Sequence, residues 1–103
     1  MRNLVLTGFM GTGKTAVGQE VARRLGRPFV DMDEQIAARA GKPISRIFGQ
    51  EGEAAFRRME SALCQELSEQ QGLVIATGGG TLADPGNRAL LAREGTVVCL
   101  SCN

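Results

Sequence analysis

A run of eight residues near the N-terminus constrains the fold of this chain more than any other feature of its sequence. Residues 8–15 read GFMGTGKT and match the pattern G-x-x-x-x-G-K-[ST]. They follow a short apolar run, Leu4–Thr7, and precede a segment whose apolar residues recur at helical spacing. A strand, a glycine-rich turn and a helix in this order place backbone N–H groups and a helix N-terminus around an anion. The run therefore predicts a phosphate-binding loop for a nucleotide.

Each position at the end of this motif has an expected role. Gly8, Gly11 and Gly13 let the backbone turn so that its N–H groups face inward, and Gly11, Thr12 and Gly13 are expected to bind the phosphates. Lys14 reaches the β- and γ-phosphates, and the Thr15 hydroxyl binds the Mg²⁺ that bridges them. The alternative is a glycine-rich turn that only connects a strand to a helix, and it is disfavoured because all eight positions and both flanks fit the motif.

Short apolar runs and helical spacings alternate along the rest of the chain. Further strands are predicted at residues 29–31, 73–77 and 96–100, and the clearest helix at about residues 53–70. Strands separated by helices require parallel crossovers. The expected fold class is therefore α/β, with helices on both faces of a parallel sheet.

Glycine and proline mark where the other helices begin and end. Gly26 and Pro28 predict the end of the first helix, while Gly41 and Gly49 predict the ends of two brief ones. The dipeptide at residues 84–85, Asp-Pro, predicts the start of the last helix.

Length and charge narrow the classes of function. With 103 residues, the chain is predicted to be a single domain, residues 1–103. Lys and Arg total 12 against 11 for Asp and Glu, so bulk charge gives no reason to expect a nucleic-acid or membrane partner. No apolar run approaches the roughly 20 residues of a membrane span. We expect a soluble cytoplasmic protein.

The residue types available for catalysis are restricted. The chain has no histidine, which excludes Ser–His and Cys–His nucleophiles. Its three cysteines show no paired metal-ligand spacing and favour a reducing compartment. Any catalysis must therefore use carboxylates, Lys, Arg, hydroxyls and the backbone.

Two carboxylates, Asp31 and Asp33, follow the second predicted strand. Both should lie at the carboxyl edge of the sheet, the same edge as the phosphate loop. If the segment is extended, the side chains point apart, and one can face Mg²⁺ while the other faces a substrate hydroxyl. The alternative, in which Asp33 caps the next helix and Asp31 is a solvated strand end, is equally open.

Two further features lie on the long helix and after the third strand. Arg57 and Glu60 are three residues apart and can pair, although an exposed ion pair is the default interpretation. Gly78, Gly79 and Gly80 allow close backbone approach to a ligand, with a plain turn as the alternative. An Asp that typical nucleoside triphosphatases place here for magnesium is missing, which leaves Asp31 as the magnesium candidate, acting through water.

Taken together, four segments are similar to the N-terminal portion of the shikimate kinase family. They are GFMGTGKT at 8–15, FVDMD at 29–33, GKPISRIFGQEGEAAFRRME at 41–60 and ATGGGT at 76–81. The resemblance implies a P-loop, nucleoside-kinase-like three-layer fold. It also implies transfer of the γ-phosphoryl group of ATP to the 3-hydroxyl of shikimate, with Mg²⁺ as the accompanying ion.

The same resemblance implies roles for individual residues. Lys14 and Asp33 would be catalytic, and Asp33 would bind the ring hydroxyls of shikimate. Arg57 would bind the shikimate carboxylate, oriented by Glu60. The three glycines at 78–80 would line the substrate pocket.

Members of that family continue past the fourth strand with an arginine-bearing lid and a fifth strand. We therefore expect the domain to be truncated after its fourth strand, with little activity of its own and an exposed strand open to self-association. Two alternatives remain: a non-catalytic ATP-binding module, and a related kinase acting on gluconate or a nucleotide.

Overall fold

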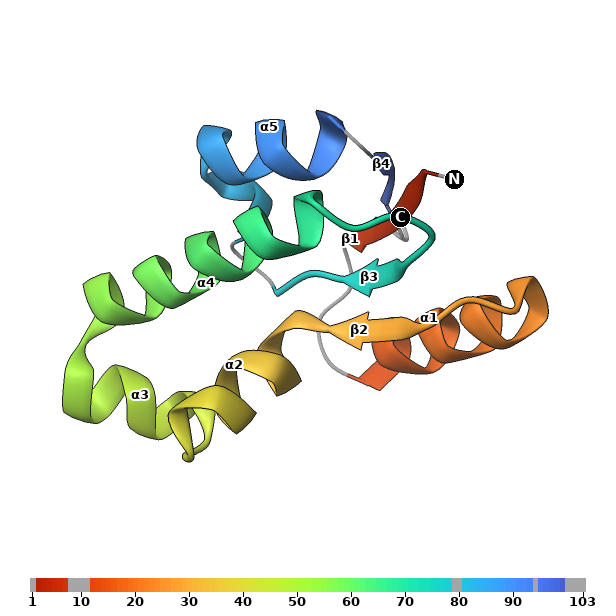
Figure 1. Cartoon of the computed structure of the whole chain (residues 1–103). Coiled ribbons are helices and arrows are strands. Elements are labelled where there is room, and N and C mark those ends of the chain that lie inside the picture. The colour runs from red at the N-terminus through yellow and green to blue at the C-terminus, as the bar shows by residue number, and fades with distance from the viewer. Residues whose placement is uncertain (1, 8–11, 79–80, 94, 100–103) are drawn as a thin grey trace.

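The computed structural model describes residues 2–7, 12–78, 81–93 and 95–99. Strands and helices alternate along the chain as predicted (Figure 1). The elements are β1 (Asn3–Thr7), α1 (Thr12–Leu25), β2 (Phe29–Asp31), α2 (Met32–Ala40), α3 (Ile44–Glu51), α4 (Glu53–Ser68), β3 (Val74–Ala76), the 3₁₀ helix η1 (Thr81–Ala83), α5 (Pro85–Arg93) and β4 (Gly95–Cys99).

The four strands form one parallel sheet in the order β2-β3-β1-β4, which confirms the predicted α/β class. Asp31 at the end of β2 lies opposite Ala76 at the end of β3, and Ala76 in turn lies opposite Leu6 of β1. The carboxyl ends of these three strands are therefore level with one another. The segments that follow these three strands therefore begin at the same edge of the sheet.

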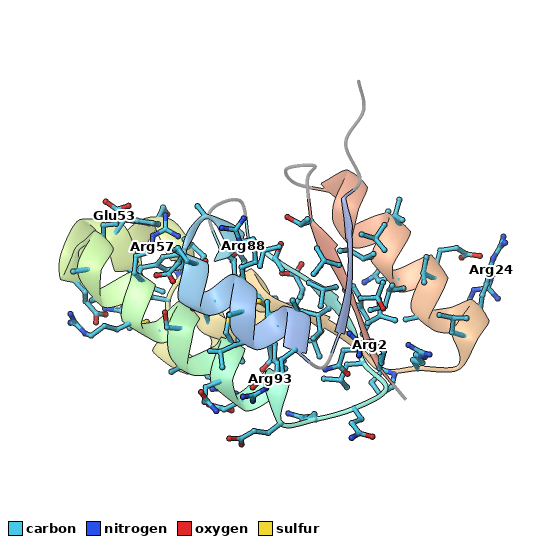
Figure 2. All side chains as sticks on the ribbon, turned by 90° about the horizontal axis from the view of Figure 1, so that it is seen from above. Arg2, Arg24, Glu53, Arg57, Arg88 and Arg93 are labelled. Atoms are coloured by element: carbon cyan, nitrogen blue, oxygen red, sulfur yellow. The ribbon has the colours of Figure 1, made fainter. Side chains whose placement is uncertain are left out.

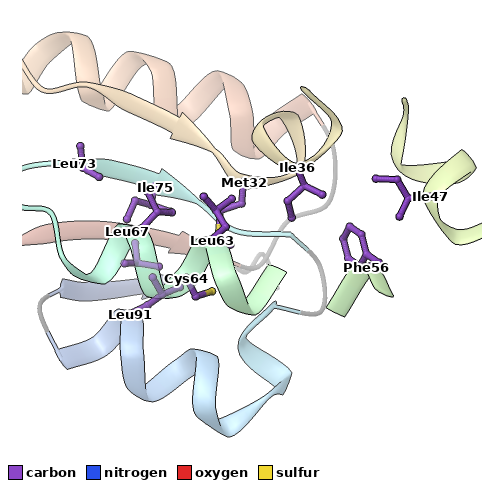
Figure 3. Close-up of a cluster of buried hydrophobic side chains, with 11 residues drawn as sticks. Met32, Ile36, Ile47, Phe56, Leu63, Cys64, Leu67, Leu73, Ile75 and Leu91 are labelled. Carbon is purple, nitrogen blue, oxygen red and sulfur yellow. The ribbon is translucent and has the colours of Figure 1, made fainter. Parts of the chain in front are cut away.

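Helices cover both faces of the sheet, because side chains alternate between the faces along each strand. Val5 and Ile75 pack with side chains of α2, α4 and α5 in the larger core cluster (Figure 3). Leu6 and Val74 point the other way and pack with Ala22 of α1. The result is the three-layer arrangement that was predicted.

Glycines end several helices in the left-handed region of φ. Gly41 (φ 72°) ends α2, and its N–H donates to the carbonyl of Ala37. The predicted end of α3 at Gly49 is wrong, because the helix continues to Glu51 and ends at Gly52 (φ 89°). Gly52 N–H donates to the carbonyls of Ile47 and Phe48, so Gly52 terminates the helix, whereas Gly49 lies within it.

No helix in the described ranges is both long and apolar enough to cross a membrane.

Candidate functional site

The candidate site lies at the carboxyl edge of the sheet, where β2 leads into α2 and β3 leads into the glycine segment. The structure brings four of the predicted residues into one chain of contacts: Asp33 on α2, Gly78 after β3, and Arg57 and Glu60 on α4. A fifth residue, Thr81, connects them and was not found from the sequence.

Asp31 is the last residue of β2 and the N-cap of α2. Its backbone is extended (φ −98°, ψ 114°), and its Oδ1 accepts a hydrogen bond from Glu34 N–H at 3.2 Å. The segment is not extended through Asp33, because the helix begins at Met32, so the condition under which the two side chains would point apart along a strand is not met. The alternative, in which Asp33 caps this helix, is wrong, since Asp31 does so.

Asp33 lies in the first turn of α2, with its carboxylate against the backbone of Gly78. A Cβ atom placed on Gly78 would lie 2.6 Å from Asp33 Oδ1 and 3.3 Å from Thr81 Oγ1. Only a residue without a side chain allows this close approach. The predicted substrate-binding residues Asp33 and Gly78 are therefore neighbours, whereas Gly79 and Gly80 lie outside the described residues.

Arg57 is held by a carboxylate on each neighbouring turn of α4. Its Nη1 donates to Glu60 Oε1 at 2.9 Å and its Nη2 to Glu53 Oε2 at 3.5 Å, and its guanidinium lies 5.4 Å from the centre of the Phe56 ring. Arg57 and Glu53 lie together near the start of α4 (Figure 2). The hydrogen bond that Arg57 donates to Glu60, more than the charge of Glu53, raises the pKa of Arg57.

The burial of the two partners differs sharply. The Arg57 side chain is 40% exposed, whereas the Glu60 side chain is 1% exposed. The default interpretation of an exposed ion pair is therefore wrong, because a carboxylate with no access to water must be satisfied by protein donors. The Arg57 side chain is thus partly exposed to solvent while a buried carboxylate fixes its position.

Thr81 supplies the second hydrogen bond to that buried carboxylate. Its Oγ1 donates to Glu60 Oε2 at 2.7 Å and accepts from Gly78 N–H at 3.1 Å. Its backbone carbonyl accepts from Asn87 Nδ2 at 3.2 Å. A hydroxyl residue directly after the glycines was the available signal, but Thr81 and Glu60 are 21 positions apart in the sequence, and no local pattern connects them.

The nucleotide side of the site is described only in part. The motif, residues 8–15, follows β1 directly, as predicted, and its last four residues form the start of α1, which begins at Thr12. Gly11 and the side chains of residues 12–15 lie outside the described part, so the roles expected of Thr12, Gly13, Lys14 and Thr15 stay predictions.

The donor types at this edge are compatible with Mg²⁺. No group of three or more His, Cys, Asp or Glu side chains suited to a metal occurs among the described residues. Mg²⁺ that accompanies a nucleotide keeps several waters and takes only one or two protein oxygens. A threonine hydroxyl (Thr15) and a carboxylate (Asp31) are oxygen donors of the required kind, and Asp31 lies at the right edge of the sheet.

A parallel sheet whose first strand is followed in sequence by the motif GFMGTGKT and by a covering helix defines the P-loop kinase fold. Within this class, the family model described as shikimate kinase matches residues 10–103. The chain belongs to the shikimate kinase family, a family of ATP-dependent kinases.

Relatives with known names agree with this assignment. A shikimate kinase of Desulforudis audaxviator is 52% identical over 103 residues, which cover 100% of this chain and 54% of that protein. One of Aromatoleum aromaticum is 55% identical over 98 residues, which cover 95% of this chain and 56% of that protein.

Solved structures superpose closely as well. A shikimate kinase from Acinetobacter baumannii, in complex with shikimate, matches 100% of this chain with a TM-score of 0.94 and 43% identity, over 57% of that chain. The Aquifex aeolicus enzyme matches 98% of this chain with a TM-score of 0.91 and 39% identity, over 60% of its own length. This chain thus spans a little over half the length of the relatives it matches.

Proposed function

We propose that residues 1–103 form the N-terminal part of a shikimate kinase, which transfers the γ-phosphoryl group of MgATP to the 3-hydroxyl of shikimate. The observation that carries the proposal is the Arg57 side chain, which is 40% exposed, is held by the buried Glu60 and is connected through Thr81 and Gly78 to the carboxylate of Asp33. This arrangement combines a fixed cation for a substrate carboxylate with a carboxylate for its hydroxyls. The shikimate complex of the A. baumannii relative supports the same substrate.

Arg57 and Asp33 divide the recognition of shikimate between them. A guanidinium can donate two parallel hydrogen bonds to a carboxylate, and one held by a buried partner loses little entropy in doing so. Asp33 accepts hydrogen bonds from the ring hydroxyls, and the absence of a side chain at Gly78 allows the Asp33 carboxylate to lie against this backbone.

In the reaction, the 3-hydroxyl oxygen forms a bond to the γ-phosphorus, and the bond from that phosphorus to the β–γ bridging oxygen breaks. The hydroxyl proton passes to Asp33. Lys14 neutralises charge on the phosphates, and Thr15 and Asp31 are the residues that would hold Mg²⁺, Asp31 through water. When bound, Mg²⁺ supplies further neutralisation of the phosphate oxygens.

Titrations of the ¹⁵N-labelled chain with shikimate and with ATP, followed by NMR, test the proposal. Arg57→Lys keeps the charge but loses the planar fork, so we expect shikimate affinity to fall about tenfold or more and ATP affinity to change less than about twofold. Lys14→Ala should do the reverse, because it removes a cation of the phosphate loop and leaves the shikimate contacts in place.

Arg58→Lys is the matched control, since Arg58 is exposed on the same helix and should leave both affinities unchanged. A titration with gluconate separates shikimate from other small substrates. The proposal fails if shikimate shifts no signals near Asp33 and Arg57, or if gluconate binds as well as shikimate.

A further inference from the structure

One continuous set of hydrogen bonds joins the end of β3 to α4. Gly78 N–H donates to Thr81 Oγ1, and the same hydroxyl donates to Glu60 Oε2. The other carboxylate oxygen, Glu60 Oε1, accepts from Arg57 Nη1. Thr81 is 0% exposed and Glu60 1%, so water does not substitute for any of these partners.

The Thr81 hydroxyl is the central member of this set, because it both accepts and donates. A hydroxyl that donates to a carboxylate becomes a better acceptor, which strengthens the bond from Gly78 N–H. Among the described residues, the hydrogen bonds to Glu60 come only from Thr81 and Arg57. Within the described ranges, each Glu60 carboxylate oxygen therefore has one donor. Of these two oxygens Arg57 bonds only Oε1, while its Nη2 donates to Glu53.

Loss of the hydroxyl would change the position of Arg57, not only the stability of the fold. A buried carboxylate oxygen without a donor is costly, so the guanidinium is drawn toward both oxygens of Glu60. It then presents fewer of its N–H groups to solvent, where a ligand would meet them. Gly78 N–H loses its acceptor at the same time, on the side of the site that faces Asp33.

We propose that Thr81 is a positioning residue, whose hydroxyl holds Arg57 and the Gly78 turn in fixed places on two sides of the site through the Glu60 carboxylate. The inference rests on the proposed function for its effect on shikimate, but the hydrogen-bonded link itself can be tested without any ligand.

The ligand-free test uses the ¹⁵N signals of the Arg57 side chain. Restrained rotation of a guanidinium gives separate signals for its two Nη groups, and we expect these in the unaltered chain and in Thr81→Ser, which keeps the hydroxyl. Thr81→Val is nearly the same size but lacks the hydroxyl, and it should shift or merge the Arg57 signals and speed hydrogen exchange at Gly78 N–H. If Thr81→Val does not fold, Thr81→Cys takes its place and should give a partial effect, because a thiol is a weaker donor.

Ser68→Ala is the matched control. Ser68 is also buried, and its hydroxyl donates to the carbonyl of Gln65 on the same helix without touching Glu60. It should lower stability without altering the Arg57 signals. Unchanged Arg57 signals in Thr81→Val, or an equal change in Ser68→Ala, would overturn the inference.

Shikimate binding is the second measurement. Thr81→Val should weaken shikimate binding about fivefold or more when Arg57 is present. The same substitution should have a much smaller effect in a chain that already carries Arg57→Lys, because the effects of residues in one hydrogen-bond network are not additive. An additive loss in the double variant would also overturn the inference. If the unaltered chain binds no shikimate, the proposed function fails, while the Arg57 signals still decide the role of Thr81.

Discussion

Gly18 faces the ring of Phe29, so that α1 lies directly against β2. A Cβ atom on Gly18 would lie 2.3 Å from Phe29 Cε1, a distance that real side chains do not reach. We expect Gly18→Ala to lower the free energy of unfolding by about 1–3 kcal/mol, because the ring or the helix must move. The gain in helix propensity, about 1 kcal/mol, does not offset this. Urea denaturation measures the change.

Gly49 is the matched control for Gly18. It also lies within a helix, but nothing is within 4 Å of a Cβ atom placed on it. Gly49→Ala should therefore raise stability by about 0.5–1 kcal/mol. A stabilising effect at both positions would show that the contact with Phe29 relaxes at little cost.

Cys64 is a buried thiol whose ionisation opposes folding. Burial, followed by the charges of Glu60 and Asp84, raises its pKa from 9.0 to about 12. Below pH 9 the thiol is protonated in both the folded and the unfolded state, and its contribution to stability is complete. Above pH 9 the unfolded thiol ionises first, so this contribution is lost as the pH rises toward 12.

We therefore expect iodoacetamide to leave Cys64 unmodified in the folded chain at pH 8 and to modify it in urea, as read by peptide mass spectrometry. Stability measured against Cys64→Ala should also fall between pH 9 and 11. Rapid modification of Cys64 under native conditions would show that the site opens often or that the thiol is ionised.

The residues of the site divide into those that the sequence could predict and those that it could not. Spacing places Arg57 and Glu60 on one helix turn, and strand order places Asp33 and Gly78 at one edge of the sheet. Spacing gives no information on burial, so the expectation of an exposed ion pair was wrong for Glu60. This residue lies on α4, which packs against α5, and its carboxylate accepts a hydrogen bond from Thr81 of η1. The role of Thr81 depends on its contact with Glu60, a residue of a distant segment, and no local sequence pattern predicts such a contact.

At the scale of elements, the start of α5 depends on one side chain. Asp84 Oδ1 accepts hydrogen bonds from Gly86 N–H at 2.7 Å and Asn87 N–H at 3.2 Å, which confirms the predicted cap before Pro85. Asp84→Ala should lower the free energy of unfolding by about 1 kcal/mol, since it leaves these N–H groups without an acceptor. Asp84→Asn keeps the acceptor and should cost much less. Equal losses in urea denaturation would contradict a capping role.

Element order was easier to predict than element ends. The alternation of apolar runs with helical spacings is repeated over the whole chain, and each repeat adds support to the same fold class. An end depends on a single residue, as at α3, where Gly49 and Gly52 are equivalent in sequence. Only the structure separates them: Gly52 has a positive φ of 89° and lies between α3 and α4, which contact each other.

At the scale of the whole molecule, the strands of the sheet differ in how many neighbouring strands they pair with. β1 and β3 lie at its centre, whereas β4 is an edge strand that pairs with β1 on one side. In the described part of the chain, β4 has no partner on its other side, and Val97 and Val98 are 38% and 36% exposed. Such an edge combines open backbone hydrogen-bonding groups with apolar side chains, and it recruits further strands.

We therefore expect the 103-residue chain to self-associate through β4, with a mean mass in light scattering that rises with protein concentration. Val98→Lys places a charge on the exposed strand and should shift the chain toward monomer. Val17→Lys is the control, because Val17 is equally exposed, at 41%, but lies on a helix whose backbone groups are already bonded. An unaltered chain that stays monomeric at high concentration would contradict the prediction, and equal effects of the two lysines would mean that general surface hydrophobicity, not the open strand, causes the association.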